Sequence, residues 1–407
     1  MKTISGGITA PLGFKAAGIA AGIKRSGNLD LAMIFSRSPA GAAGMFTSNK
    51  VKAAPVNLSI EHLKKGKAQA IVANAGNANA CNGASGMVAA DKMANRAAKL
   101  LKIKKESVLV ASTGTIGVPF PTEKVLKGID ILAKKLSKEG GENAARAIMT
   151  TDTRKKEIAV AVNIGGKAVK IGAIAKGSGM ICPNMKSYSK PHATMFCFIT
   201  TDANIKLPAL TKALGGAISD SFNMVTIDND QSTNDTAFIL ANGMSCAKEI
   251  KASGKDFRVF SEALNYVCIF LAKEMARDGE GATKLLEVRV DKAKTLQDAR
   301  LGAKVVAGSN LLKSAIFGAD PNWGRVMAAI GYSGASLDPD KVDVSICGMK
   351  VVKSGHGLSF NKEALRKHFS GREVVISIDL NLGRYGAVAW GCDLSYDYVK
   401  INAEYHT

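Results

Sequence analysis

The chain lacks the sequence features of a membrane protein or a secreted protein. No stretch of its 407 residues approaches the run of roughly 20 apolar residues that crosses a bilayer. Residues 1–10 contain one lysine but no continuous apolar segment, so they do not resemble a secretory signal. We therefore expect a cytoplasmic protein that makes no contact with a membrane.

Cysteine and histidine are too few and too scattered for several kinds of site. The seven cysteines lie between Cys81 and Cys392 without a C-x-x-C pair, which argues against a disulfide framework or a zinc site. The five histidines show no repeated spacing, so neither a His-based triad nor a metal centre is expected. A P-loop, a G-x-G-x-x-G motif after a strand and a G-x-S-x-G motif are also missing.

Acidic and aromatic residues are in short supply. The chain has 55 Lys and Arg against 34 Asp and Glu, which gives a formal net charge of +21. A basic chain can bind nucleic acid, but the lysines are spread along the whole length, and aromatic residues make up only 6% without interleaving with basic ones. A dispersed positive field also attracts anionic substrates. Nucleic-acid binding is therefore only a remote alternative.

Length and composition predict an α/β (α+β) protein with more than one lobe. A chain of 407 residues is too long for one ordinary core, so two or three lobes are expected. Apolar runs of short period predict strands, and apolar residues at helical spacing predict helices. The predicted strands lie at 31–35, 68–73, 108–111, 195–199, 224–227, 285–290, 342–346, 373–382 and 387–390, with a hairpin at 157–175. The predicted helices lie at 87–102, 121–139, 207–222 and 257–275, with a shorter one ending at 148.

The segment 176–203 carries the clearest chemical signal. A glycine-serine turn, an apolar stretch closed by Pro183 and a basic insert lead to Ala193 and Thr194, after which an apolar strand begins. In a self-cleaving precursor, the Thr194 hydroxyl attacks the carbonyl of the small residue Ala193, and water then releases Thr194 as a new N-terminus. The released α-amine has an ordinary pKa of roughly 7.7–8.0 and can activate the hydroxyl near neutral pH. This pattern predicts Thr194 as an N-terminal nucleophile.

The sequence S-T-G-T-I-G follows the predicted strand at 108–111. A turn at Thr113 and Gly114 would direct backbone N–H groups and hydroxyl groups outward, as an oxyanion hole requires. An ordinary Ser-Thr-Gly turn is the alternative. The Asn-rich loop N-A-G-N-A-N, which follows the strand at 68–73, is suited either to tight turns close to a ligand or to a plain surface loop.

An acidic loop contains Asp228, Asp230 and Asp235. The glycine and the terminal glutamate of an EF-hand are missing from it, so a calcium site is not predicted. We expect a rigid turn beside the active site instead.

Several of these motifs occur together in one known family. The motif K-G-S-G-M-I-x-P-N-M at 176–185, followed by A-T-M at 193–195, resembles the signature of the ornithine acetyltransferases. This is the family of bifunctional ornithine acetyltransferase/N-acetylglutamate synthases, the self-cleaving glutamate N-acetyltransferases of arginine biosynthesis. The resemblance covers almost the whole chain and includes R-D-G-E-G-A-T at 277–283. It implies a multi-lobed fold with mixed sheets covered by helices. It also implies cleavage into an alpha chain, 1–193, and a beta chain, 194–407, which assemble as a heterotetramer of two alpha and two beta chains.

The resemblance also implies roles for individual residues. Thr113 and Gly114 would stabilise the oxyanion, and the Asn-rich loop would lie near the active site. By default, an isolated lysine, a loop glutamate and a C-terminal tail are solvated surface features, and a threonine cluster such as that at 150–153 caps or turns the chain. Substrate contacts are nevertheless implied for Thr150, Lys176, Thr194, Glu280, Asn402 and Thr407.

The function expected from these motifs is ping-pong acetyl transfer. Thr194 would take the acetyl group from N²-acetylornithine and pass it to glutamate, with Lys176 and Glu280 guiding the substrates. No metal or organic cofactor is expected, because the chemistry is covalent and electrostatic. Monofunctional and bifunctional members share these parts, so acetyl-CoA as a further donor is an open alternative.

The chain departs from the family pattern in three places. Cys182 stands where the family usually has His, the insert 186–192 precedes the proposed cleavage point, and His406 replaces the more usual Arg. Two other functions were weighed. An N-terminal-nucleophile aminopeptidase or amidase would share Thr194 but lose its acyl group to water. A non-enzymatic nucleic-acid-binding protein would leave Thr194 uncleaved.

Overall fold

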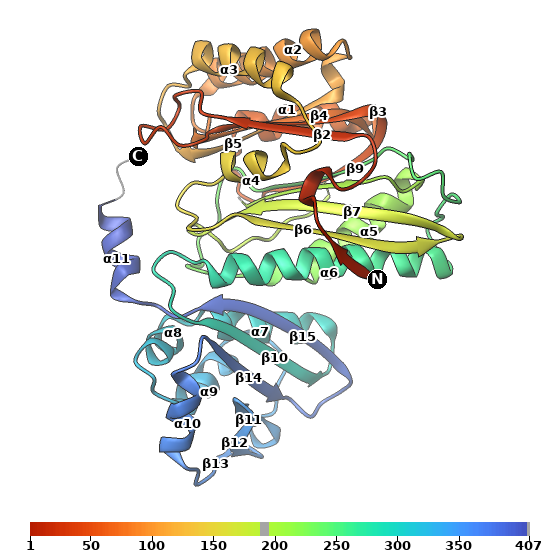
Figure 1. Ribbon diagram of the computed structural model, residues 1–407. Helices are drawn as coiled ribbons and strands as arrows, with labels where there is room; N and C mark the ends of the chain where they lie inside the picture. Colours follow the sequence, from red (N-terminus) through yellow and green to blue (C-terminus); the bar gives the residue numbers. More distant parts are fainter. Residues whose placement is uncertain (188–194, 405–407) are drawn as a thin grey trace.

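The computed structural model describes residues 1–187 and 195–404, which form two lobes of α/β structure (Figure 1). The first lobe contains the strands β1 (Lys2–Ile4), β2 (Phe14–Ile19), β3 (Leu31–Phe46), β4 (Lys67–Asn77), β5 (Val108–Thr115), β6 (Lys156–Ile164), β7 (Lys167–Lys176), β8 (Phe196–Thr201) and β9 (Thr236–Ala241). Its helices are α1 (Ala54–His62), α2 (Gly83–Leu101), α3 (Thr122–Lys135), α4 (Gly141–Ala147), α5 (Leu207–Ser219) and α6 (Lys255–Arg277).

The second lobe is formed by the last third of the chain (Figure 1). Its strands are β10 (Leu285–Ala293), β11 (Asp343–Ile346), β12 (Met349–Lys353), β13 (His356–Gly357), β14 (Glu373–Asp379) and β15 (Tyr385–Cys392). Its helices are α7 (Leu296–Gly308), α8 (Asn310–Phe317), α9 (Trp323–Gly331), α10 (Lys362–Phe369) and α11 (Tyr396–Ala403). Helix α11 leaves this lobe and runs back beside the first one.

Each lobe is built on a mixed sheet. Within the described residues, the first sheet has the strand order β1-β6-β7-β8-β9-β3-β4-β5, with β2 paired to β3 outside this path. The second sheet has the order β13-β12-β11-β14-β10-β15. Both contain parallel pairs, such as β8 with β9 and β10 with β14, and antiparallel pairs, such as β6 with β7. The predicted fold class, α/β with mixed sheets covered by helices, is confirmed.

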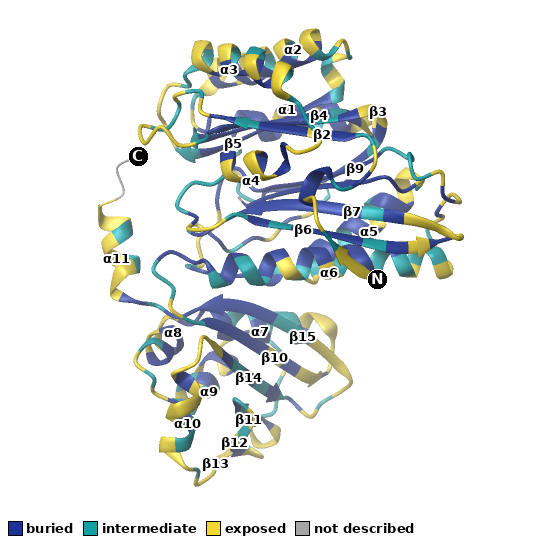
Figure 2. Ribbon diagram, viewed as in Figure 1, coloured by how far each residue is buried: buried dark blue, intermediate teal, exposed yellow. Residues whose placement is uncertain are grey.

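Helices separate and cover the sheets (Figure 1). Helices α2 and α3 cover one face of the β2–β5 region, and α4 lies between that region and β6–β7. Helix α6 lies between the first sheet and the second sheet. Figure 2 shows that buried residues predominate in the central strands of the first sheet and on the inward side of α6, whereas β13 and the hairpin end of β7 are exposed. No helix in the described part of the chain is both long enough and apolar enough to cross a membrane.

One apolar cluster crosses the boundary between the lobes. It includes Val160 of β6, Leu264 of α6, Val288 of β10 and Ile376 of β14, all of them buried. Helix α6 can serve both sheets because its apolar residues recur at three- and four-residue spacing and give it a buried stripe. The two lobes therefore share a core and do not behave as independent units joined by a linker.

The hairpin of β6 and β7 agrees with the sequence prediction. Gly165 and Gly166 have φ values of 58° and 82°, which is the backbone that a two-residue hairpin turn of right-handed twist requires. The pairing runs without interruption from Lys156–Ala175 to Ile164–Lys167. The second strand ends at Lys176 and delivers this side chain to the end of the sheet.

Other predicted elements differ from the structure. The expected strand at 224–227 is wrong: this segment forms a short 3-10 turn, η4 (Phe222–Met224), and a single bridge from Val225 to Trp390. The segment is apolar because it is buried under the second sheet, and its short apolar run therefore resembles that of a buried strand. Thr113 and Gly114 lie in the last residues of β5, whereas the sequence placed them on a turn after the strand. Strand β3 continues to Phe46, well beyond the predicted end at 35, and α1 has no counterpart in the prediction.

Gly140 offers a test of how closely α4 packs on β2. A Cβ atom at position 140 would overlap the carbonyl oxygen of Ala16 in β2. We expect Gly140→Ala to lower the free energy of unfolding by about 1–3 kcal/mol, because the backbone of one element must move. The matched control is Gly216→Ala on the exposed side of α5, where no atom lies within 4 Å. This control should raise stability by roughly 0.5–1 kcal/mol through helix propensity. Urea titration of both variants checks the prediction, and equal stability of the two variants would contradict it.

Candidate active site

The six predicted site residues that the structure describes all line one cavity of about 140 Å³. The cavity lies where the end of β5, the end of β7, the α6–β10 loop and α11 meet. Its walls are formed by Thr113, Gly114, Thr150, Thr151, Lys176, Gly179, Met180, Ser232, Glu280 and Asn402. The structure therefore brings together Thr113, Gly114, Thr150, Lys176, Glu280 and Asn402, which are separated by up to 289 residues (402 − 113) in the sequence.

Three predicted residues cannot be placed. Ala193, Thr194 and Thr407 lie outside the described residues, as do His406 and most of the insert 186–192. The assignment of Thr194 as the nucleophile stays a prediction.

Thr113 and Gly114, the pair predicted to form the oxyanion hole, lie on a closely packed edge of the sheet. Thr113 and Gly114 are aligned with Ala75 and Gly76 in the parallel pairing of β4 with β5. Gly114 has a φ of 132°, and a Cβ atom there would overlap the backbone of Gly76 and Asn77. Only glycine fits this position. The local shape thus directs the Gly114 backbone and the Thr113 side chain toward the cavity wall.

Lys176 is a buried cation at the cavity. Its side chain is nearly inaccessible, and its ammonium group lies 4.0 Å from Oδ2 of Asp152. Among the described residues, the ammonium group donates no hydrogen bond to a protein acceptor. Burial lowers the pKa of Lys176, and the nearby Asp152 carboxylate offsets part of this effect. An anionic group in the cavity would complete the coordination of this ammonium group.

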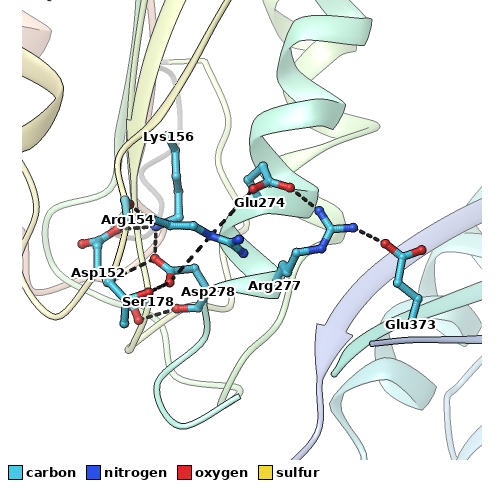
Figure 3. Close-up of polar contacts among 9 residues, drawn as sticks. Asp152, Arg154, Lys156, Ser178, Glu274, Arg277, Asp278 and Glu373 are labelled. Atoms are coloured by element: carbon cyan, nitrogen blue, oxygen red, sulfur yellow. Dashed lines mark hydrogen bonds and ion pairs between the residues drawn. The ribbon is translucent and has the colours of Figure 1, made fainter. Parts of the chain in front are cut away.

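Behind Lys176 lies a buried ion cluster, shown in Figure 3. The ammonium group of Lys156 is completely buried and bonds Oδ1 of Asp152 at 2.7 Å and Oδ2 of Asp278 at 2.5 Å. Burial alone would raise the pKa of Asp152, but the ammonium groups of Lys156 and Lys176 outweigh this effect and hold that pKa well below its usual range. The Asp152 carboxylate therefore stays ionised.

The cluster fixes the backbone around the cavity. Asp152 accepts hydrogen bonds from the N–H groups of Gly177 at 2.7 Å and Thr150 at 3.0 Å. On the other side, the Ser178 hydroxyl donates to the Asp278 carbonyl at 2.6 Å, and the Glu280 N–H donates to the Ser178 carbonyl at 2.9 Å. Thr150, the turn at 177–179 and the loop that carries Glu280 are thus held in one frame.

The frame extends into the second lobe (Figure 3). Arg277, at the end of α6, bonds both Glu274 on its own helix and Glu373 at the start of β14. Arg154 lies within 3.9 Å of Asp278 and 3.8 Å of Glu274. The orientation of the site is therefore connected to the position of the second sheet.

Glu280 projects against the glycine-serine turn. A Cβ atom at Gly179 would overlap the Glu280 carboxylate, so this close approach requires glycine. The amide of Asn402, from α11, donates to Oε2 of Glu280 at 2.9 Å. This contact brings the C-terminal helix to the cavity, in place of the frayed tail that a C-terminus forms by default.

The acidic loop before β9 frames the other wall. Asp228 accepts the N–H groups of Met180 at 2.6 Å and Ile181 at 2.9 Å, and the Asn234 amide bonds the carbonyls of Ala78 and Ser112. In the described part of the chain, no group of three or more His, Cys, Asp and Glu is arranged to hold a metal ion. The hydrogen bonds of Asp228 and Asn234 hold this turn against the residues that follow β7 and against β5.

Asp235 ends this loop and has an unusual environment. It is 0% exposed, and neither of its carboxylate oxygens has a hydrogen-bond partner among the described residues. Burial raises the pKa of Asp235 well above its usual range, although Lys176 acts in the opposite direction. The sequence analysis treated Asp235 as a turn residue, and no local sequence signal distinguishes it from Asp228 and Asp230.

A larger cavity of about 540 Å³ adjoins the site and shares Gly114, Thr150 and Thr151 with it. Its lining includes Lys24 and Asn77, neither of which was predicted as a site residue. Asn77 belongs to the predicted Asn-rich loop. Residues 74–77 of that segment form the end of β4 instead, and Gly76 and Asn77 line the adjoining cavity.

Comparison with known proteins identifies the family. The model of the ArgJ family matches residues 15–407. The chain belongs to the ArgJ family. Within it, the chain is 51% identical over the full length of both proteins to the "Arginine biosynthesis bifunctional protein ArgJ" of Caldanaerobacter subterraneus subsp. tengcongensis. It is 47% identical, again over both full lengths, to the "Glutamate N-acetyltransferase" of Methanocaldococcus jannaschii.

A solved structure gives the same result. The crystal structure of "Arginine biosynthesis bifunctional protein argJ" from Bacillus halodurans matches with 43% identity and a TM-score of 0.50. The match covers 51% of this chain and 98% of the solved chain. The ArgJ resemblance inferred from the 176–185 and 277–283 motifs is confirmed, and so is the expectation of an acyltransferase enzyme of arginine biosynthesis.

The ion cluster of this ArgJ-family chain can be tested by removing its cation. We expect Lys156→Met to lower the free energy of unfolding by about 3–5 kcal/mol, because two buried carboxylates lose their shared partner. Lys155→Met is the matched control. Its ammonium group bonds Glu142 and Glu157 near the surface, so the loss should stay within about 1 kcal/mol. Equal losses in urea titrations of the two variants would contradict the prediction.

The same variant should change how stability depends on pH. In the wild type, the lowered pKa of Asp152 gives stability that is present above the ordinary aspartate pKa of roughly 4 and is lost only as the pH falls below it. In Lys156→Met, burial raises this pKa, so stability falls as the pH rises. The deficit of the variant relative to the wild type should therefore shrink between about pH 8 and about pH 5, and a constant deficit would oppose this assignment.

Proposed function

We propose that the protein transfers the acetyl group of N²-acetylornithine to glutamate through an ester on Thr194. The observation that carries this proposal is the convergence of Thr113, Gly114, the buried Lys176 and Glu280, which accepts a hydrogen bond from Asn402, on one cavity of about 140 Å³. Membership of the ArgJ family supports it. Relatives that are 51% and 47% identical to this chain are named as an arginine-biosynthesis protein and a glutamate N-acetyltransferase.

Self-cleavage comes first in the proposed sequence. The Thr194 hydroxyl attacks the Ala193 carbonyl, and the peptide bond is exchanged for an ester while the nitrogen of Thr194 takes up a proton. Water then hydrolyses the ester and leaves the chains 1–193 and 194–407 with a free amine on Thr194. The match to the solved Bacillus halodurans chain covers 98% of that chain but 51% of this one. A cut near the middle of this chain would give a fragment of that size.

Acyl transfer then takes place in two half-reactions. The Thr194 hydroxyl attacks the acetyl carbonyl, the α-amine takes its proton, and ornithine leaves with a proton returned to its nitrogen. The negative oxygen of each tetrahedral intermediate is stabilised by the Thr113 hydroxyl and the Gly114 N–H, donors of the type whose removal costs about 10²–10³ in rate. The amine of glutamate next attacks the ester and carries the acetyl group away.

Lys176 and Glu280 orient both substrates. Ornithine and glutamate each carry an α-carboxylate, and the buried ammonium group of Lys176 offers the matching charge. Glu280, oriented by Asn402, accepts a hydrogen bond from an amino group of the substrate, and Thr150 contributes a hydroxyl at the cavity wall. Thr407 is proposed as a further substrate contact. No metal and no organic cofactor enters these steps.

The proposed assembly contains two chains of each kind, as the motifs imply. Acetyl-CoA as a second donor is a wider form of the proposal. It is favoured by the adjoining cavity of about 540 Å³, with Lys24 and Arg25 in its lining, and by relatives named bifunctional. Replacing N²-acetylornithine with acetyl-CoA in the assay tests this form.

Thr194→Ala is the direct test of the nucleophile. We expect the purified variant to remain one chain and to lose acetyl transfer by at least roughly 10⁴-fold, because no other group forms the ester. Ornithine and N-acetylglutamate are measured together, so that transfer is distinguished from the hydrolysis of an aminopeptidase or amidase. The control is Thr3→Ala on the exposed edge strand β1, which should be cleaved and active. Transfer at the wild-type rate by Thr194→Ala would overturn the proposal.

Lys176→Met tests substrate orientation separately from chemistry. We expect kcat/KM for both N²-acetylornithine and glutamate to fall about 10–100-fold, since a charge-assisted hydrogen bond is worth about 1.5–3 kcal/mol. Self-cleavage should persist. Lys170→Met, whose side chain lies elsewhere on β7, is the matched control. A loss for only one of the two substrates would argue against a shared carboxylate site.

A further inference from the structure

The cavity that adjoins the active site has the size of a ligand pocket. Ligand pockets usually occupy roughly 300–1,000 Å³, a range that contains the adjoining cavity of about 540 Å³ but not the smaller one of about 140 Å³. Gly114, Thr150 and Thr151 line both cavities. A substrate whose α-carboxylate lies in the smaller cavity, beside Lys176, can therefore extend its side chain past these residues into the larger one.

Lys24 is held at a fixed place in the lining of the larger cavity. It lies on the loop that connects β2 to β3. The buried Asp30 carboxylate holds this loop by accepting the N–H groups of Ile23 at 2.6 Å and Lys24 at 3.0 Å. The Lys24 ammonium group donates to the Leu29 carbonyl at 2.6 Å, across the same loop. These bonds fix both the backbone and the charged end of Lys24.

The charge of Lys24 is not paired with a carboxylate. Among the described residues, the Leu29 carbonyl is the only hydrogen-bond acceptor of its ammonium group, and no carboxylate lies within 4.0 Å. An ammonium group has three N–H donors, so two are available to a ligand. Burial lowers the pKa of Lys24, the carboxylates of Asp30 and Asp152 act in the opposite direction, and the nearby charge of Lys176 lowers it further. Lys24 is thus a half-buried cation near Lys176 without an anion of its own.

The larger cavity favours an anionic group. Its described lining contains Lys24 and Arg25 but no aspartate or glutamate. Arg25 is exposed, whereas Lys24 is half-buried, and a half-buried charge is screened less by solvent. Lys24 therefore has the stronger effect on a ligand in the cavity. The two amino acids of the proposed reaction differ at this point, since the glutamate side chain ends in a carboxylate and the ornithine side chain ends in an ammonium group.

We propose that Lys24 is a specificity-determining residue that binds the side-chain carboxylate of the acceptor glutamate. This inference rests on the proposed function. With its α-carboxylate at Lys176, glutamate extends its second carboxylate into the larger cavity, where the Lys24 ammonium group donates hydrogen bonds to it. Ornithine in the same orientation brings a cation toward Lys24 and is repelled. Lys24 thus favours the replacement of ornithine by glutamate and limits the return of the acetyl group to ornithine.

The first test compares the two substrates in Lys24→Met. In ping-pong kinetics, kcat/KM for each substrate reports on its own half-reaction. We expect kcat/KM for glutamate to fall about 10–100-fold, because a charge-assisted hydrogen bond is lost. The value for N²-acetylornithine should stay the same or rise, because the repulsion of its ammonium group is removed. Lys24→Arg, which keeps the charge, should retain most of the activity with glutamate.

The matched control is Lys124→Met on α3. The Lys124 ammonium group donates to the Gly22 carbonyl of the same loop at 3.0 Å, but Lys124 does not line the cavity. This variant should leave kcat/KM unchanged for both substrates. If Lys24 only stabilised the loop through Leu29, Lys24→Met would lower both values to the same extent. Equal losses for the two substrates would therefore overturn the inference.

The second test reverses the charge with Lys24→Glu. The return of acetyl groups to ornithine is measured without glutamate, as the exchange of isotopically labelled ornithine into N²-acetylornithine. We expect this exchange to become faster by about tenfold, while transfer to glutamate falls more than in Lys24→Met, because attraction replaces repulsion for one amino acid and the reverse holds for the other. A variant in which both reactions slow in parallel would contradict the inference.

A phosphate of acetyl-CoA could use the same cation, and a third measurement separates the two anions. With acetyl-CoA as the donor, kcat/KM for acetyl-CoA in Lys24→Met should stay close to the wild-type value. A loss confined to acetyl-CoA would assign Lys24 to a phosphate and overturn the inference. A wild type that transfers no acetyl group from N²-acetylornithine would overturn the proposed function, and the inference with it. An active wild type together with unchanged kcat/KM for glutamate in Lys24→Met would overturn the inference alone.

Discussion

The buried contact of Lys156 with Asp152 and Asp278 is the constraint on which the site depends. The three groups come from the start of β6, from the loop before it and from the end of α6, and their charges are compensated only when all three are in place. The Asp152 carboxylate also accepts the N–H groups of Thr150 and Gly177, and the Asp278 carbonyl accepts the Ser178 hydroxyl, so correct folding of this cluster sets the shape of the cavity. Stability and active-site geometry thus have one common origin.

The groups left without full compensation lie where acyl transfer needs them. The Lys176 ammonium group lies 4.0 Å from the Asp152 carboxylate, which also bonds Lys156. The Asp235 carboxylate has no hydrogen-bond partner among the described residues. Each costs stability, and in the proposed function the charge on Lys176 would be compensated by a substrate carboxylate. Functional sites tolerate such losses of stability, because the many favourable contacts of the surrounding structure hold the groups in place.

Sequence reasoning found what depends on short-range pattern. The β6–β7 hairpin, the buried stripe of α6 and the delivery of Lys176 by β7 follow from glycine placement and apolar spacing, and the family follows from contiguous motifs. It failed where tertiary contacts decide. The segment 224–227 is apolar because it is covered, and Lys156 looks like one of many surface lysines until Asp278, 122 residues away, is brought to it. Asp235 is distinguished from its neighbours by burial alone.

The measurement closest to the central claim is the intact mass of the purified protein, before and after exposure to N²-acetylornithine and then to glutamate. The account predicts two chains that meet between Ala193 and Thr194. The chain that begins at Thr194 should gain one acetyl group from the donor and lose it when glutamate is added. A single uncut chain, or two chains of which neither acquires an acetyl group, would contradict the account.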